Sequence, residues 1–170
     1  MEKIKALFEK HREIVMYLIF GVLTTVVGWA VYFALFWSFK AVFGIPPEDT
    51  SGALYLTGYT ISQIVQWIAA VLFAFFTNRR WVFTDAEKNV PICRQLPTFA
   101  GARLLTLGID YVVTYFGAMA LSAWFPAIVA YEIFGVKLNL ADLISKLCAA
   151  VIVIICNYVF SKLFVFKKAK

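Results

Sequence analysis

The sequence predicts an all-α membrane protein whose four transmembrane helices form two helical hairpins of similar design. Three observations predict this fold: the apolar composition, four long apolar segments, and a motif that ends both the second and the fourth segment. Hydrophobic residues make up 62% of the 170 residues and charged residues 15%, whereas an average soluble domain is about 45–50% apolar and about 25% charged. Because so few polar side chains cannot cover a surface in water, we interpret residues 1–170 as a single transmembrane domain.

Four apolar segments are long enough to cross a bilayer, which takes about 20 helical residues. They cover about residues 14–39, 53–76, 99–125 and 143–164. Pro46 and Pro47 separate the first two spans, because consecutive prolines cannot continue a helix. We expect residues 84–97 to form a polar hinge between the middle spans and residues 126–140 to form an apolar loop along the membrane surface.

The distribution of Lys and Arg predicts the orientation, because cytoplasmic loops of membrane proteins carry an excess of these residues. Twelve of the 16 cations fall on the side that holds both chain ends: Lys3, Lys5, Lys10, Arg12, Arg79, Arg80, Lys88, Arg94, Lys162, Lys167, Lys168 and Lys170. Both termini are therefore expected in the cytoplasm. The net charge of +6 then reflects membrane orientation and does not indicate nucleic-acid binding.

The N-terminal residues 2–12 precede the first span and place Ile4, Leu7 and Phe8 on one helical face, with basic residues around them. Two interpretations remain open: a short helix lying in the anionic cytoplasmic leaflet, or a positively charged flank that only sets topology. The apolar run that follows is too long for the core of a cleaved signal peptide.

The motif at the end of the second span recurs at the end of the fourth. Residues 75–83 read FFTNRRWVF and residues 159–166 read VFSKLFVF, which pairs Asn78 with Ser161, Arg79 with Lys162, Trp81 with Phe164 and Phe83 with Phe166. The first and third spans also align, with Tyr17 opposite Phe99, Thr24 opposite Thr106 and Gly28 opposite Asp110. Because both hairpins start and finish in the cytoplasm, we expect a parallel repeat. The cationic ends suit membrane anchoring, and they equally suit a phosphate-bearing lipid headgroup.

Three polar residues of the third span, Arg103, Thr106 and Asp110, share one helical face. An ionisable group at this depth costs about 2.5–3.5 kcal/mol on insertion scales, so these residues are candidates for a functional site. Guanidinium binds phosphate oxygens in a bidentate manner and stays protonated, which makes Arg103 the best candidate for an anion site. The structural alternative is neutralisation within the protein, for example by Lys146 reaching inward to Asp110.

These motifs together resemble the GtrA-like family of small four-span membrane proteins. The resemblance is carried by YLIFGVLTT at residues 17–25, by F-x-N-R-x-W-x-F at residues 76–83, by Phe99-x-Gly-Ala-Arg103 with Thr106 and Asp110, and by the run from Asn157 to Phe166. It covers essentially the whole chain. The sequence departs from the family pattern in Ser161-Lys162, where the second repeat often has Asn-Arg, and in Gly28, where a polar residue is common.

The resemblance implies a role in cell-surface polysaccharide or teichoic-acid glycosylation. Family members are thought to flip polyprenyl-phosphate-linked sugars across the cytoplasmic membrane of prokaryotes, beside a glycosyltransferase that makes the donor lipid. We therefore expect the phosphate to bind Arg103 after being gathered from the cytoplasmic leaflet by Arg79, Arg80 and Lys162. Asp110 is expected to accept sugar hydroxyls or to offset the Arg103 charge. Three neutral residues complete the expected substrate site: Asn78, Thr106 and Asn157.

The sequence contains no ATP-binding motif, metal-ligand cluster or nucleophile arrangement, so we expect neither a cofactor nor catalysis by this chain alone. The main alternative function is a membrane anchor or assembly subunit for a glycosyltransferase. A four-helix cation or drug exporter ranks last, because Arg103 and the basic rims favour an anion. Gly21, Thr25 and Gly28 form a stripe of small residues that indicates close helix packing, and so thin a bundle favours a homo-oligomer.

Overall fold

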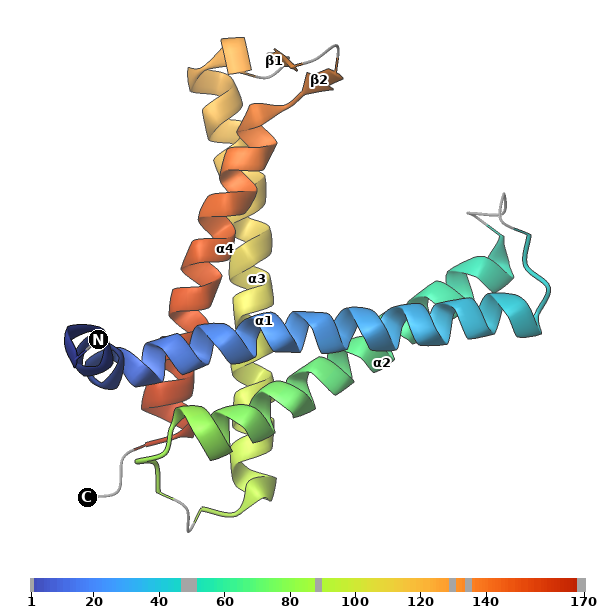
Figure 1. The fold of residues 1–170 in the computed structure, drawn as a ribbon. Helices are drawn as coiled ribbons and strands as arrows, with labels where there is room; N and C mark the ends of the chain where they lie inside the picture. Colours follow the sequence, from blue (N-terminus) through green and yellow to red (C-terminus); the bar gives the residue numbers. More distant parts are fainter. Residues whose placement is uncertain (1, 47–51, 88–89, 129–130, 134–135, 168–170) are drawn as a thin grey trace. The chain divides into compact units, whose positions relative to one another are not determined.

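The computed structural model describes residues 2–46, 52–87, 90–128, 131–133 and 136–167. It contains four long helices, α1 (Glu2–Val42), α2 (Ala53–Thr77), α3 (Ile92–Trp124) and α4 (Leu140–Phe160) (Figure 1). A five-residue π turn continues α2 as η1 (Asn78–Val82) and α4 as η3 (Ser161–Val165). All four helices are long and apolar enough to cross a bilayer, which confirms the predicted multi-pass membrane protein with four spans.

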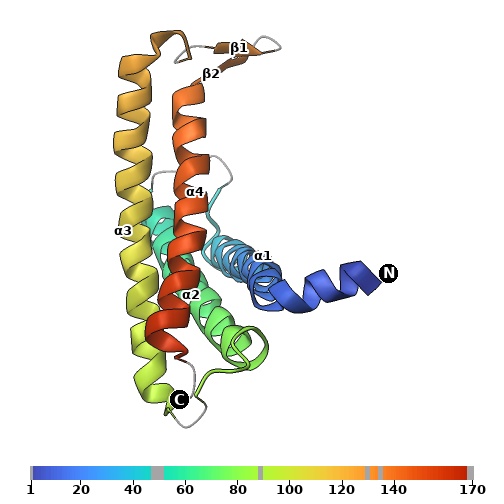
Figure 2. The same cartoon turned by 90° about the vertical axis from the view of Figure 1, so that its left-hand side faces the viewer.

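The helices pair in chain order. Helix α1 packs along α2 within residues 1–86, and α3 packs antiparallel along α4 within residues 87–170, so each compact unit is one helical hairpin (Figures 1 and 2). Three statements stay predictions: that the hairpins are parallel repeats, that both termini are cytoplasmic, and that the chain forms a single transmembrane domain.

Helix α3 begins earlier than its apolar stretch indicates. Its first residue is Ile92, so residues 92–97 of the expected hinge are helical and Pro97 lies inside the helix. Hydropathy misses this turn because Arg94 and Gln95 interrupt the apolar run, although the Gln95 side chain is buried and donates to the Val165 carbonyl at 3.2 Å. Pro47, Glu48 and Asp49 of the predicted break, and Lys88, Lys168 and Lys170, lie outside the described residues.

The connection between α3 and α4 is more ordered than the expected apolar loop. Its described residues form a 3₁₀ turn, η2 (Pro126–Ile128), and two short antiparallel strands, β1 (Tyr131–Ile133) and β2 (Val136–Leu138). Both strands consist of an apolar, a charged and an apolar residue, the alternation typical of a short hairpin. Asn139 then caps α4, because its side-chain oxygen accepts from the backbone N–H of Ala141 at 3.1 Å.

Helix α1 is bent near its start. His11 has a non-helical backbone (φ −113°, ψ 16°), which separates the first nine helical residues from the apolar part of α1. The apolar stretch without charged residues begins at Ile14, three residues beyond the kink. The kink therefore falls where the predicted N-terminal segment meets the first span, and the surface location of that segment stays a prediction.

Small residues bring α1 and α2 together. A Cβ added at Gly28 would lie 3.1 Å from Gln66 Oε1 and 3.7 Å from the Ala70 methyl group, so Gly28 allows a close approach of the two helices. A Cβ at Gly21 would have no neighbour within 4 Å. The stripe of small residues thus serves packing within the hairpin at Gly28, whereas no group of the first hairpin packs against Gly21.

Substitution of Gly58 by leucine is expected to destabilise the first hairpin by about 1–3 kcal/mol, the usual cost of overpacking. Gly58 is buried, and even a methyl group there would overlap the Phe39 ring of α1. Thermal unfolding in detergent measures the effect, with Gly21→Leu as the matched control. Equal melting temperatures for the two variants would contradict the packing described here.

Candidate functional site

Arg103 lies on α3 with its guanidinium carbon 4.9 Å from the centroid of the Phe99 ring. Phe99 is fully buried and its ring packs against Phe166, which follows η3, at a centroid distance of 6.0 Å. The stacked cation is thus held in place by a ring that is itself anchored. Among the described residues of this hairpin, no carboxylate pairs with the half-buried Arg103.

One turn further along α3, Thr106 connects the two helices of this hairpin. Its hydroxyl lies 2.9 Å from Oδ1 of Asn157 on α4 and 3.0 Å from the carbonyl oxygen of Arg103. Both side chains are buried. The Thr106 hydroxyl therefore finds an acceptor across the hairpin in Asn157, and this contact holds the α3 turn that carries Arg103 against α4.

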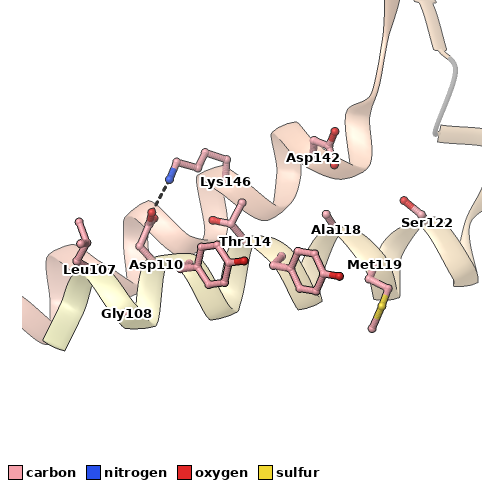
Figure 3. A pocket seen from close by; sticks show the side chains of 11 residues that line it. Leu107, Gly108, Asp110, Thr114, Ala118, Met119, Ser122, Asp142 and Lys146 are labelled. Carbon is pink, nitrogen blue, oxygen red and sulfur yellow. Dashed lines mark hydrogen bonds and ion pairs between the residues drawn. The ribbon is translucent and has the colours of Figure 1, made fainter. Parts of the chain in front are cut away.

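Asp110 forms an ion pair with Lys146 of α4, at 2.6 Å between Oδ2 and Nζ (Figure 3). The expectation that Asp110 offsets the charge of Arg103 is not met within this hairpin, because the carboxylate is held by the lysine. Neutralisation by Lys146, the alternative left open above, is the arrangement observed. Pairing lowers the cost of both charges inside the apolar layer, and it leaves the charge of Arg103 without a counter-ion in the same hairpin.

The end of α2 gathers cations in the first hairpin. Asn78 is buried within the π turn, Arg79 is half-buried, and Arg80 is exposed with its guanidinium 5.5 Å from the Trp81 ring centroid. Arg12 of α1 joins them, because its guanidinium donates to the Trp81 carbonyl at 3.3 Å. Sequence reasoning counted Arg12 only for topology, since nothing in the sequence aligns the start of α1 with residue 81.

Lys162, the predicted counterpart of Arg79, folds back along its own helix. Its ammonium group donates to the Tyr158 hydroxyl at 2.9 Å and lies 5.3 Å from the centroid of the same ring. The ammonium group is thus held at the end of α4 by one side chain of that helix. Five of the predicted residues thus belong to the second hairpin, on three elements: Arg103, Thr106 and Asp110 on α3, Asn157 on α4 and Lys162 in η3.

The two hairpins end in the same local structure. In η1 the backbone N–H of Phe83 donates to the Asn78 carbonyl at 2.9 Å, and in η3 that of Phe166 donates to the Ser161 carbonyl at 2.7 Å. Phe83 then packs on Tyr17 at a centroid distance of 6.4 Å, as Phe166 packs on Phe99. We call each such pair of a π turn and its packed ring an aromatic clasp. π turns occur frequently at functional sites.

A family model described as the GtrA/DPMS transmembrane domain matches residues 16–166. The chain belongs to this family. The match includes both aromatic clasps and every residue predicted for the substrate site.

Several relatives of this GtrA/DPMS protein align along nearly their whole length. The "Cell wall teichoic acid glycosylation protein GtcA" of Listeria monocytogenes serovar 1/2a is 29% identical, with 100% of this chain and 95% of the relative covered. Its namesake in Listeria innocua serovar 6a is 30% identical with the same coverage. The "Uncharacterized membrane protein YwcD" of Bacillus subtilis is 28% identical, with 91% of this chain and 97% of the relative covered. None of the solved structures matches the chain.

The geometry of this GtrA/DPMS protein groups the predicted residues into two sets. Asn78, Arg79 and Arg80 lie together at the end of the first hairpin, and the other five lie along the α3–α4 hairpin. The main residue missing from the prediction of the substrate site is Lys146. The sequence has Lys146 as one of two lysines in the fourth apolar segment and offers it only as a residue that neutralises Asp110. The pairing of α3 and α4 places its ammonium group against that carboxylate.

Proposed function

We propose that this protein moves a polyprenyl-phosphate-linked sugar across the cytoplasmic membrane, so that a cell-surface glycan can be glycosylated. The relatives named for cell wall teichoic acid glycosylation support the process. The protein itself performs no chemical step on this proposal. It acts beside a glycosyltransferase that loads the sugar onto the lipid at the cytoplasmic face.

The observation that carries the proposal is Arg103. A guanidinium without a carboxylate partner in its own hairpin, stacked on a buried ring inside a membrane span, is costly unless an anion binds it. Phosphate fits this site, because its oxygens match the donor fork of arginine and no proton has to be removed. A helix that only anchored a partner enzyme would have no need of this charge.

The remaining predicted residues take supporting roles. With both termini in the cytoplasm, Arg79 and the exposed Arg80 of the first hairpin and Lys162 of the second attract the phosphate from the anionic leaflet. The matching aromatic clasps support an arrangement of the hairpins as parallel repeats, which present their cationic ends on the same side of the membrane. The face of α1 at Gly21, which the first hairpin leaves uncovered, is a surface for self-association.

Reconstitution in liposomes tests the proposal. Purified protein is incorporated into vesicles that carry radiolabelled decaprenyl phosphate glucose, and an impermeant enzyme added outside reports how much of the glucose becomes accessible. We expect protein-dependent movement without nucleotide. Intact protein that moves no lipid, yet retains a glycosyltransferase during purification, would contradict translocation and favour the assembly subunit instead.

A further inference from the structure

A cavity of about 210 Å³ lies at one end of the second hairpin, between the first turns of α3 and the residues around the end of η3. Figure 2 shows these two segments side by side. The cavity is smaller than the roughly 300–1,000 Å³ of typical ligand pockets, so it accommodates a small polar group and not a complete sugar lipid. Five polar side chains and one ring line it: Glu87, Arg94, Gln95, Thr98, Lys167 and Phe164.

Arg94 and Lys167 bring two positive charges to this cavity from different segments of the hairpin. Both residues are exposed, and among the described residues neither side chain is paired with a carboxylate. Glu87 adds one negative charge, so two cations and one carboxylate leave the lining with a net charge of +1. Because opposite charges attract, a cavity with this lining favours an anion that carries one negative charge.

The frame of the cavity is held by contacts that do not use these two cationic groups. The backbone N–H of Glu87 donates to the Lys167 carbonyl at 2.8 Å, which joins the start of the hairpin to its end. The buried Gln95 side chain donates to the Val165 carbonyl at 3.2 Å, which joins α3 to η3. The guanidinium of Arg94 and the ammonium group of Lys167 thus remain for a ligand.

The cavity lies at the edge of the apolar layer. Phe164, whose exposed ring lines the cavity, is the last residue of the fourth apolar stretch, and Lys167 follows three residues later. Arg94 likewise precedes the third apolar stretch, which begins at Phe99. Aromatic and cationic side chains in this order are typical of the depth at which lipid headgroups lie. A group bound in the cavity is therefore next to the phosphates of a bilayer and not among its acyl chains.

We propose that this cavity binds the phosphodiester headgroup of an anionic phospholipid such as phosphatidylglycerol. The single negative charge of a phosphodiester matches the net charge of the lining. Arg94 offers it paired donors and Lys167 a second cation, and the headgroup hydroxyls of phosphatidylglycerol can donate to Glu87.

This headgroup site is separate from the site proposed for the transported lipid. Arg94 precedes Arg103 by nine residues of α3, which is about 14 Å at 1.5 Å per residue. The cavity also has no room for a sugar beside a phosphate bound at Arg103. The inference therefore does not depend on translocation, and it adds a lipid that binds the protein without being moved.

The test follows the melting temperature of the full-length protein in a neutral detergent, because a ligand that binds the folded state raises it. Five probes are added separately: phosphatidylglycerol, phosphatidylethanolamine, phosphatidylcholine, inorganic phosphate and decaprenyl phosphate glucose. We expect phosphatidylglycerol to cause a saturable rise, and the next three probes to cause little or none. The concentration that gives half of the rise measures the affinity.

Arg94→Ala and Lys167→Ala are each expected to weaken the binding of phosphatidylglycerol by about tenfold, the effect of one hydrogen bond between charged groups. Lys10→Ala is the matched control, since it removes an exposed cation of the first hairpin, and it should weaken binding by less than about twofold. Without added lipid all three variants should melt as the wild type does. The rise caused by decaprenyl phosphate glucose should also be unchanged.

Thr98→Phe separates a built site from general attraction between cations and anionic lipid. It keeps both cations but fills part of the cavity with a ring. Thr98 is exposed and its hydroxyl donates to the Arg94 carbonyl of its own helix at 3.0 Å, so the fold should tolerate the change. We expect this variant to bind phosphatidylglycerol about as weakly as Arg94→Ala does.

The remaining outcomes would each overturn the proposal. No saturable rise with phosphatidylglycerol, or equal losses in Lys10→Ala and Arg94→Ala, would refute the site. A larger rise with phosphatidylethanolamine that Glu87→Gln removes would indicate a zwitterionic ligand. A rise with inorganic phosphate that Arg94→Ala removes would show that a free anion suffices.

Decaprenyl phosphate glucose distinguishes this proposal from the proposed function. If Arg94→Ala also removes the rise that this lipid causes, the cavity belongs to the transported lipid and the separate headgroup site is refuted. If phosphatidylglycerol raises the melting temperature while decaprenyl phosphate glucose has no effect on the wild type, the headgroup site is supported and the translocation proposal fails.

Discussion

Replacing Arg103 by alanine is expected to weaken binding of decaprenyl phosphate glucose by about tenfold to a hundredfold and to stop its movement in vesicles. The range corresponds to hydrogen bonds between charged groups, worth about 1.5–3 kcal/mol. Both the glucosyl lipid and bare decaprenyl phosphate should be affected, since the guanidinium contacts the phosphate they share. Arg103→Lys retains the charge but loses the bidentate geometry, so an intermediate loss is expected.

Arg94→Ala is the matched control for this experiment, because Arg94 is an exposed arginine of the same helix close to its first residue. It should keep most of the binding and transport. The fold of Arg103→Ala is checked by its melting temperature, which is expected to fall little, since the guanidinium gives up only a stacking contact on Phe99. A correctly folded Arg103→Ala protein that still binds and moves the lipid would remove the basis of the proposed mechanism.

Breaking the ion pair between Asp110 and Lys146 is expected to destabilise the second hairpin by about 2.5–3.5 kcal/mol, the cost of one unpaired charge in a membrane span. Asp110→Asn leaves the lysine unpaired, and Lys146→Met leaves the carboxylate unpaired. The double variant removes both charges and should recover most of the lost stability. Melting temperatures of the four proteins in detergent form a double-mutant cycle that isolates the coupling between the two side chains.

The same four proteins separate a structural from a functional role of the pair. We expect the double variant to be stable but slow in transport, because it has lost the Asp110 carboxylate that is expected to accept sugar hydroxyls. Glu87→Gln, a carboxylate outside the spans, should change neither property. Additive losses in the two single variants, with no recovery in the double variant, would show that the two charges do not stabilise each other.

Much of the fold follows from hydropathy alone. Four apolar stretches predicted four helices, because a span must satisfy its backbone internally and few residues tolerate the bilayer core. The shared face of Arg103, Thr106 and Asp110 followed from helical spacing, and the latter two do meet side chains of α4. Hydropathy could not predict the structure outside the apolar layer. The examples are the first turns of α3 and the hairpin formed by β1 and β2.

Which side chains form pairs could not be predicted from the sequence, for a different reason. Asp110 had two candidate cations, Arg103 on its own helix and Lys146 on α4, and only the register of the two helices decides between them. Arg12 reaches the end of α2 for the same kind of reason.

The aromatic clasps also determine where the chain can change in length. Each π turn closes its hydrogen bond over one residue more than an α turn does. Deleting one residue from Asn78–Val82 or from Ser161–Val165 would let the backbone continue as an ordinary α-helix. Every later residue would then be rotated by about 100°, and Phe83 or Phe166 would leave the ring it packs on. Insertions and deletions that preserve function should consequently fall in the connections between the helices. The two π turns, ten residues together, should keep their length.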